Sequence, residues 1–127
     1  MVRKRISFDF DDTLCGEKTG IPNHIMIEIL HKHFADGHDI YIVTARDERH
    51  ETEEWQINFM PNRVLIKEFI KEHKLPIREI HYTCHEPKGP LLKELEIDLH
   101  YDDSLTHLNS CKEHGIEAIH PKDMEQL

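Results

Sequence analysis

Short apolar runs alternate along the chain with longer stretches in which apolar residues recur every three or four positions. The short runs have the length of buried strands, and the longer stretches have the spacing of helices with one apolar face. The predicted strands span residues 6–10, 40–43, 79–82, 97–101 and 116–119. The predicted helices span residues 25–34, 64–73, 90–95 and 105–114, and we expect the charged segment 47–55 to be a surface loop or helix.

Residues that start or stop helices support these bounds. Asn23 is a suitable N-cap for the first predicted helix, and Gly37 follows its end. Pro76 breaks the chain before the third strand, and Gly115 ends the last helix.

The regular succession of strand and helix predicts a three-layer α/β fold, in which helices cover both faces of a Rossmann-like parallel sheet. The crossovers between parallel strands are expected to be right-handed. A chain of 127 residues suits one compact domain, so we expect a single domain over residues 1–127. Ligands of such sheets bind at the carboxyl ends of the strands.

Polar residues that could carry chemistry come directly after three of the predicted strands. Each of them alone is an ordinary turn residue. Together they recur at strand ends that meet at one edge of a parallel sheet, and this coincidence predicts a site there. The residues are Asp9 and Asp11 after the first strand, Thr44 and Arg46 after the second, and Asp102 and Asp103 after the fourth.

Asp9 and Asp11 lie two residues apart, so their carboxylates repel each other unless a cation lies between them. Hard oxygen ligands of this kind favour Mg²⁺, which shares its protein sites with phosphate. The cation would allow one carboxylate to attack phosphorus, while the other protonates the leaving oxygen and later deprotonates water. The alternative for a lone Asp-x-Asp pair is an acidic turn without function.

Two further strand-end or loop positions offer groups for a phosphate. The hydroxyl of Thr44 could donate to a phosphate oxygen, and Arg46 could bind the phosphate or the rest of the substrate. Lys88 lies in a loop before a predicted helix, where its ammonium could neutralise both nucleophile and phosphate. Lys93 on that helix competes for the same role, and the loop position favours Lys88.

The order of these motifs resembles the haloacid dehalogenase-like superfamily over residues 5 to about 120. A strand followed by Asp-x-Asp-x-Thr is the most specific part, and the lysine is the least specific. The residues that carry the resemblance are Asp9, Asp11, Thr13, Thr44, Lys88, Asp102 and Asp103.

The resemblance implies a Mg²⁺-dependent phosphomonoester hydrolase. Asp9 would be the nucleophile that forms an aspartyl-phosphate. Asp11 would be the general acid and base, and its backbone carbonyl would bind Mg²⁺. Thr44 and Lys88 would bind the phosphoryl group, and Thr13 would assist in substrate binding.

The Asp-Asp pair completes the implied metal site, with Asp103 as the third ligand and Asp102 supporting the site from behind. Many members of the superfamily have another acidic residue four positions further on, where this chain has His107. The segments in which members insert a cap domain are short here, so we expect no cap or a minimal one. An open site of this kind suits large substrates or the ends of macromolecules.

The run from Thr44 to Glu48 followed by Trp55, together with the later Asp102-Asp103-Ser104, also resembles the 3′-phosphatase domain of phage-type polynucleotide kinase and small nucleotidases. This resemblance implies a nucleotide or a polynucleotide 3′-phosphate as substrate, with a small-metabolite phosphate ester as the alternative. Arg46, Arg49 and Trp55 are candidates for contacts to the rest of the substrate, although a solvated charged face is an equal interpretation.

The composition of the chain limits which binding partners and which cellular compartment we expect. The formal net charge of −9 disfavours unspecific coating of nucleic acid, though a local basic rim could bind one phosphorylated end. No apolar run approaches the roughly 20 residues that cross a bilayer, so no membrane partner is expected. Three widely spaced cysteines fit a reducing compartment, and we expect a soluble cytoplasmic protein.

Three other interpretations remain open. A non-enzymatic phosphoacceptor receiver domain also uses Asp, Thr and Lys at sheet ends, but in a different order along the chain. His81, Cys84 and His85 are close enough in sequence to bind zinc, but no second ligand pair follows. Trp55, Phe59 and Met60 could form a homo-oligomer contact or pack within the chain.

Overall fold

A five-stranded sheet forms the centre of the protein, and all its strands are parallel in the order β3-β2-β1-β4-β5. The computed structural model describes residues 2–125. The strands are β1 (Arg5–Phe8), β2 (Asp39–Thr44), β3 (Ile77–Tyr82), β4 (Leu99–Tyr101) and β5 (Glu117–Ile119). The helices are α1 (His24–Ala35), α2 (Glu53–Phe59), α3 (Ile66–Glu72), α4 (Gly89–Glu94), α5 (Leu105–Glu113) and α6 (Pro121–Glu125), with a 3-10 helix η1 (Glu48–His50).

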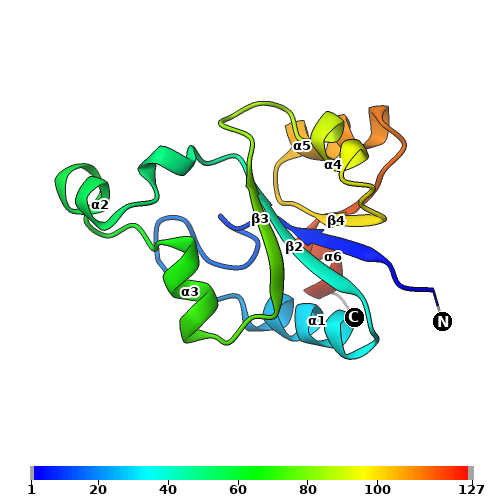
Figure 1. Cartoon of the computed structure of the whole chain (residues 1–127), viewed down its shortest axis with the longest axis horizontal. Coiled ribbons are helices and arrows are strands. Elements are labelled where there is room, and N and C mark those ends of the chain that lie inside the picture. The colour runs from blue at the N-terminus through cyan, green and yellow to red at the C-terminus, as the bar shows by residue number, and fades with distance from the viewer. Residues whose placement is uncertain (1, 126–127) are drawn as a thin grey trace.

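The predicted three-layer α/β fold is confirmed. Helices α4 and α5 lie on one face of the sheet, and α1, α3 and α6 lie on the other (Figure 1). Every predicted strand and helix is present, with ends that differ by a few residues. The side chain of Asn23 caps α1 as predicted and accepts a hydrogen bond from the backbone N of Met26 at 3.3 Å. The short C-terminal helix α6 was not predicted.

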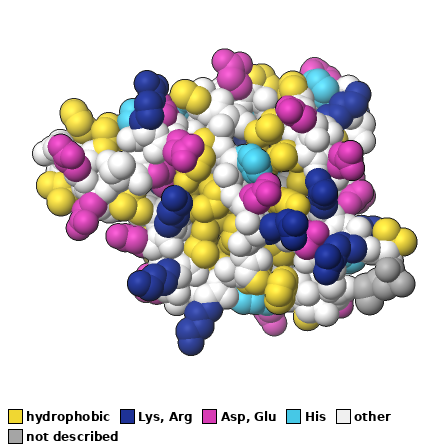
Figure 2. Space-filling model, in the orientation of Figure 1, with side chains coloured by type: hydrophobic (Ala, Val, Ile, Leu, Met, Phe, Trp, Pro, Cys, Tyr) yellow, Lys and Arg dark blue, Asp and Glu magenta, His cyan; other side chains and the backbone are white. Residues whose placement is uncertain are grey.

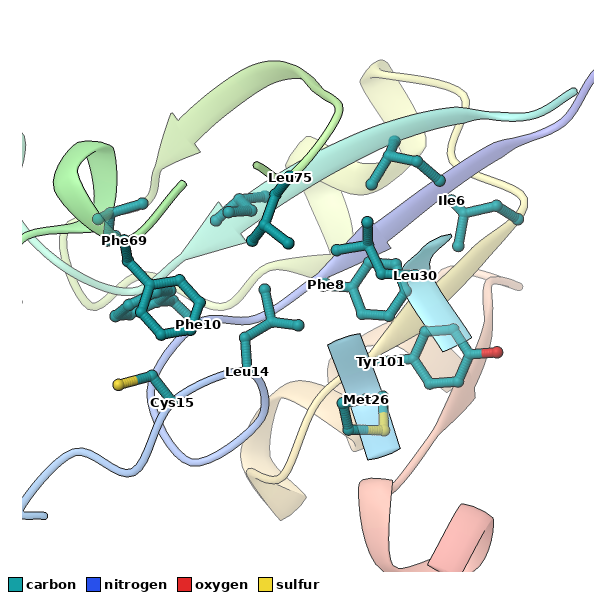
Figure 3. Packing of buried hydrophobic residues seen from close by; sticks show 13 residues of the cluster. Ile6, Phe8, Phe10, Leu14, Cys15, Met26, Leu30, Phe69, Leu75 and Tyr101 are labelled. Carbon is teal, nitrogen blue, oxygen red and sulfur yellow. The ribbon is translucent and has the colours of Figure 1, made fainter. Parts of the chain in front are cut away.

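Two apolar cores fill the spaces between the sheet and its helices. The larger core lies on the α1 side, where the rings of Phe8 and Tyr101 stack with their centroids 4.7 Å apart (Figure 3). Met26 and Leu30 of α1 belong to the same cluster. The smaller core lies under α4 and α5 and includes Leu92. Since side chains alternate along a strand, each residue of β1 is committed to one of these two sides.

Strand β1 ends at Phe8, before the predicted end at residue 10. Asp9 still donates its backbone N–H to the carbonyl of Tyr101 at 2.8 Å, but the chain then turns sharply. The carbonyl of Phe10 accepts from the N–H groups of the three residues 13–15, and Asp12 has a left-handed φ of 60°. The turn places the acidic loop at the carboxyl edge of the sheet.

Among residues 2–125, no helix is both long enough and apolar enough to cross a membrane.

Candidate active site

Asp9 lies at the carboxyl end of the central strand, where only 6% of its surface is exposed. Its Oδ1 accepts a hydrogen bond from Lys88 Nζ at 2.8 Å. Its Oδ2 has a weaker contact, 3.5 Å from Thr13 Oγ1. Burial raises the pKa of Asp9, the charge of Asp102 raises it further, and Lys88 opposes both effects. A cation beside this carboxylate would offset the cost of burying its charge.

Lys88 is the lysine that reaches the strand ends, whereas Lys93 is exposed on α4. The Lys88 side chain is fully buried, and its Nζ donates to Asp102 Oδ2 at 2.6 Å as well as to Asp9. Burial alone would lower its pKa, but the two carboxylates raise it, so the ammonium stays charged. One buried cation therefore joins two carboxylates that come from neighbouring strands.

The position of Lys88 depends on close packing at the start of α4. The next residue, Gly89, donates its backbone N–H to Ser110 Oγ of α5 at 3.0 Å. A Cβ at Gly89 would lie 2.5 Å from both His114 Nδ1 and the carbonyl oxygen of Ser110. Only glycine allows α5 to approach this closely, which fixes the turn that carries Lys88 inward.

Asp102 is completely buried, and all its bonds go to groups of the protein. Its Oδ2 contacts His100 Nε2 at 2.8 Å in addition to Lys88, and its Oδ1 accepts from the backbone N of Ser104. Burial would raise its pKa, but the bond to His100 and the charge of Lys88 lower it. His100 Nδ1 in turn lies 2.6 Å from Ser7 Oγ.

Sequence reasoning missed both Ser7 and His100. His100 is fully buried, and three consecutive hydrogen bonds, through Asp102 and Lys88, connect it to Asp9. A usable signal was present, because each residue is a polar break in an apolar strand. Each also precedes an acidic strand-end residue by two positions and therefore shares its face of the sheet.

Arg46 is buried and holds Asp11. Its Nε and Nη2 donate to the two carboxylate oxygens of Asp11 at 2.9 and 2.7 Å. Its Nη1 donates to Glu51 at 3.0 Å and to the carbonyl of Val64 at 2.8 Å. Burial would lower the pKa of Arg46, but Asp11 and Glu51 raise it, so it stays a cation. Most of its donors are thus used within the protein.

A pocket of about 350 Å³ opens in front of these groups. The carboxylates that line it outnumber the cations by six to three, so a phosphate dianion would meet a negative surface. The acidic lining residues are Asp9, Asp11, Asp12, Glu17, Asp47 and Asp103, and the basic ones are Arg46, Arg63 and Lys88. A divalent cation would correct this imbalance.

The donor set fits Mg²⁺. Among residues 2–125, the group of acidic, histidine and cysteine side chains that lies close enough to hold one ion is Asp9, Asp102 and Asp103, with ligand atoms within 4.8 Å of one another. All three offer hard carboxylate oxygens. Because the oxygens of Asp102 already bind Lys88, His100 and Ser104, Asp9 and Asp103 are the carboxylates with capacity to spare.

The other predicted residues lie at different distances from the pocket. Thr44 is fully buried and is not among the residues that line the pocket. Its Oγ1 accepts a hydrogen bond from the backbone N of Arg46 at 3.2 Å. The side chain of Arg49 is 82% exposed and pairs with Asp47, so the structure does not bring it together with Asp9 and Lys88. His107 lines the pocket, and its buried Nδ1 has no hydrogen-bond partner within the described chain.

The three residues considered as an alternative zinc site do not assemble in the described part of the chain. His81 pairs with Glu79 at 2.9 Å, and Cys84 is exposed. His85 lines the acidic pocket instead.

We expected no cap or a minimal one, and the segment between β2 and α3, residues 45–65, is here called the minimal cap. It contains η1 and α2, projects from the body of the protein, and carries apolar and acidic side chains (Figures 1 and 2). Trp55 stacks on His50 with ring centroids 4.2 Å apart, and Arg63 lies over Trp55 at 5.5 Å. Met60 lines the pocket, whereas Phe59 is 68% exposed.

No protein-family model and no curated protein matches this sequence. Solved structures do match the fold. A chain of the Pnkp1/Rnl/Hen1 RNA repair complex matches 94% of this chain with a TM-score of 0.69 and 11% identity. The core domain of a protein provisionally named a phosphoglycolate phosphatase, from Streptococcus pneumoniae, matches 94% of this chain and 80% of its own length, with a TM-score of 0.52 and 16% identity.

These similarities show a shared α/β fold. This chain spans only 42% of the length of the matching chain in the RNA repair complex. At such identities the fold alone is comparable, and the chemistry has to be argued from the site.

Proposed function

We propose that this protein is a Mg²⁺-dependent phosphomonoester hydrolase of the haloacid dehalogenase type, with Asp9 as its nucleophile. The observation that carries the proposal is the buried Lys88 ammonium, which binds both Asp9 and Asp102. A fully buried lysine held by two carboxylates at the mouth of an acidic pocket is costly for stability, which favours a catalytic purpose. Thr13, Thr44 and Asp103 occupy the positions that the superfamily pattern expects.

In the first step, an oxygen of Asp9 attacks phosphorus. Oδ1 is held by Lys88 at 2.8 Å, whereas Oδ2 has only the 3.5 Å contact to Thr13 and is the freer oxygen. The Oδ2–P bond forms as the bond from phosphorus to the leaving oxygen breaks. Asp11 supplies the proton that the leaving oxygen takes up. Lys88 stabilises the negative charge that collects on the transferring group.

In the second step, water attacks phosphorus and Asp11 takes up its proton. The bond between phosphorus and Asp9 breaks, which restores the carboxylate and releases inorganic phosphate. Asp9 and Asp103 would hold Mg²⁺, and the ion would supply charge neutralisation for the incoming phosphate. Arg46 holds Asp11 at the pocket wall, so one Asp11 oxygen has to leave the guanidinium to exchange protons with substrate or water.

We infer that the substrate is a nucleotide or a polynucleotide 3′-phosphate. The minimal cap supports this, since a small metabolite would be left exposed to solvent during the reaction. Arg63, His50 and His85 line the pocket and could contact the part of the substrate beyond the phosphate. A small-metabolite ester is the alternative, and the same assay separates the two.

The test is phosphate release with Mg²⁺ from a 3′-phosphorylated oligonucleotide, from nucleoside monophosphates and from a panel of sugar phosphates. Asp9→Asn should abolish release, and Asp36→Asn, an exposed aspartate beyond α1, should not. A phosphoryl group on the Asp9 peptide after acid quenching would identify the nucleophile. Stable phosphorylation without turnover would favour the receiver-like alternative, and release that survives Asp9→Asn would contradict the mechanism.

A further inference from the structure

A line of four buried polar side chains continues below the nucleophile, away from the pocket. Lys88, Asp102, His100 and Ser7 each have 0% of their surface exposed. Consecutive members are joined at 2.6, 2.8 and 2.6 Å. The line starts at the ammonium that binds Asp9 and ends inside the smaller core.

The sheet register produces this line. Ser7 of β1 and His100 of β4 are directly paired in the parallel ladder. A period of two places Ser7 on the same face as Asp9, and His100 on the same face as Asp102. The second pair therefore lies one step beneath the two carboxylates that bind Lys88.

The direction of each hydrogen bond follows from the chemistry of the groups. Asp102 Oδ2 accepts from the Lys88 ammonium, so it can only accept from His100 as well, and His100 carries its proton on Nε2. Burial lowers the pKa of His100, which leaves Nδ1 as an acceptor. The hydroxyl of Ser7 then donates to Nδ1. One tautomer of His100 satisfies the whole line.

Packing alone does not account for this line. On the face of the sheet that carries Ser7 and His100, the neighbouring strand β2 contributes Tyr41, the register partner of Ser7, and Val43, both buried in the smaller apolar core. Apolar residues at positions 7 and 100 would avoid the desolvation of a hydroxyl and an imidazole. They would also remove one of the two bonds to Asp102 Oδ2 and leave the carboxylate held by Lys88 and the backbone N of Ser104 alone.

We propose that Ser7 and His100 are positioning residues that orient Asp102, and through it the Lys88 ammonium, toward the phosphoryl group on Asp9. This inference rests on the proposed function. His100 fixes the plane of the Asp102 carboxylate, and Ser7 fixes the tautomer of His100. With both in place, Lys88 stays aligned with Asp9 Oδ1 while charge builds up on the transferring group.

The test compares four variants with the wild type in steady-state phosphate release, with thermal unfolding measured alongside. Ser7→Ala removes the hydrogen bond between Ser7 and His100, and His100→Leu removes the bonds of His100 to both Ser7 and Asp102. His100→Gln keeps a donor for Asp102 in a side chain without a ring. Tyr101→Phe is the matched control, because it removes a hydroxyl that bonds His33 Nε2 at 2.9 Å on the opposite face of β4.

We expect His100→Leu to lower kcat by about 10- to 100-fold with a smaller change in KM, since a positioning residue acts mainly on the reacting group. Ser7→Ala should lower kcat less, His100→Gln should recover part of the loss, and Tyr101→Phe should keep wild-type kcat. If His100→Leu does not fold, Ser7→Ala and His100→Gln carry the comparison. Wild-type kcat in folded Ser7→Ala and His100→Gln would overturn the proposal while the proposed function stands.

A second readout needs no substrate. Long-range ¹H–¹⁵N NMR of the wild type should show neutral His100 with its proton on Nε2, and Ser7→Ala should disturb that tautomer. A wild type that releases phosphate from no substrate contradicts the proposed function, whereas a proton on Nδ1 overturns this inference in either case.

Discussion

Arg46 donates to both carboxylate oxygens of Asp11, from Nε to Oδ2 at 2.9 Å and from Nη2 to Oδ1 at 2.7 Å. The same guanidinium binds Glu51 and the carbonyl of Val64, which stand at either end of the segment that carries α2. Glu51 also accepts from the backbone N of Ile66, the first residue of α3. Arg46 therefore joins the proposed general acid and base to both ends of the minimal cap.

Arg46→Lys should lower kcat/KM by about 10- to 100-fold, because an ammonium cannot hold two Asp11 oxygens and Glu51 at once. The charge is kept, so the loss would report geometry rather than electrostatics. Phosphate release from the preferred substrate measures the effect. Arg78→Lys is the control, since Arg78 has a 59% exposed side chain and only a 3.9 Å pair with Asp39. Full activity in Arg46→Lys would show that Asp11 needs no such support.

The sequence was sufficient for the fold and for much of the site. Strand and helix periods predicted the parallel sheet, and the strand-end rule placed Asp9 and Asp102 at one edge of it. Lys88 was chosen for its loop position and for the superfamily resemblance. These predictions depend on local pattern and on the order of elements. Helix α6 was missed because it has five residues, too few for a helical period to be visible.

Contacts that depend on how loops close could not be predicted. Arg46 was expected to bind substrate, but the return of the chain at Val64 places a carbonyl and Glu51 around its guanidinium. Substrate binding by Arg46 stays a prediction, because most of its N–H groups already donate to Asp11, Glu51 and Val64. His100 was overlooked for another reason, since twelve histidines in the chain gave no cue to which of them is buried beside Asp102.

Mg²⁺ should raise the melting temperature of the wild type, because a ligand that binds only the folded state stabilises it by mass action. Asp103→Asn should remove most of that shift, since Asp103 is the carboxylate whose oxygens are not bound to Lys88 or His100. A chelator should reverse the effect. Asp36→Asn is the control and should keep the full shift. An undiminished shift in Asp103→Asn would place the ion elsewhere.

Gly89→Ala should destabilise the protein by about 1–3 kcal/mol, the usual cost of forcing a methyl group into a packed contact. The added Cβ would lie 2.5 Å from the carbonyl oxygen of Ser110, which backbone packing holds in place. Because Lys88 precedes Gly89, phosphate release should fall as well. Chemical denaturation and activity assays measure the two effects.

Gly115→Asn is the control for this change. Gly115 has a φ of +70° and nothing within 4 Å of an added Cβ, and asparagine tolerates that backbone conformation. It should cost less stability than Gly89→Ala and leave kcat unchanged. Equal destabilisation by both variants would mean that the close approach of α4 and α5 does not matter.

The pH dependence of stability should carry a contribution from His33. Burial lowers its pKa below the usual 6.5, and the nearby His38 adds to this effect. The unfolded chain therefore takes up a proton at His33 before the folded protein does, so this contribution to stability is complete above pH 6.5 and is lost as the pH falls below it. Urea unfolding at pH 7.5 and pH 5.5 measures the loss. The loss of stability between the two pH values should be smaller in His33→Gln than in the wild type. It should be unchanged in His31→Gln, because His31 is exposed on the same helix. An equal loss in the wild type and in His33→Gln would assign the pH dependence of stability to other groups.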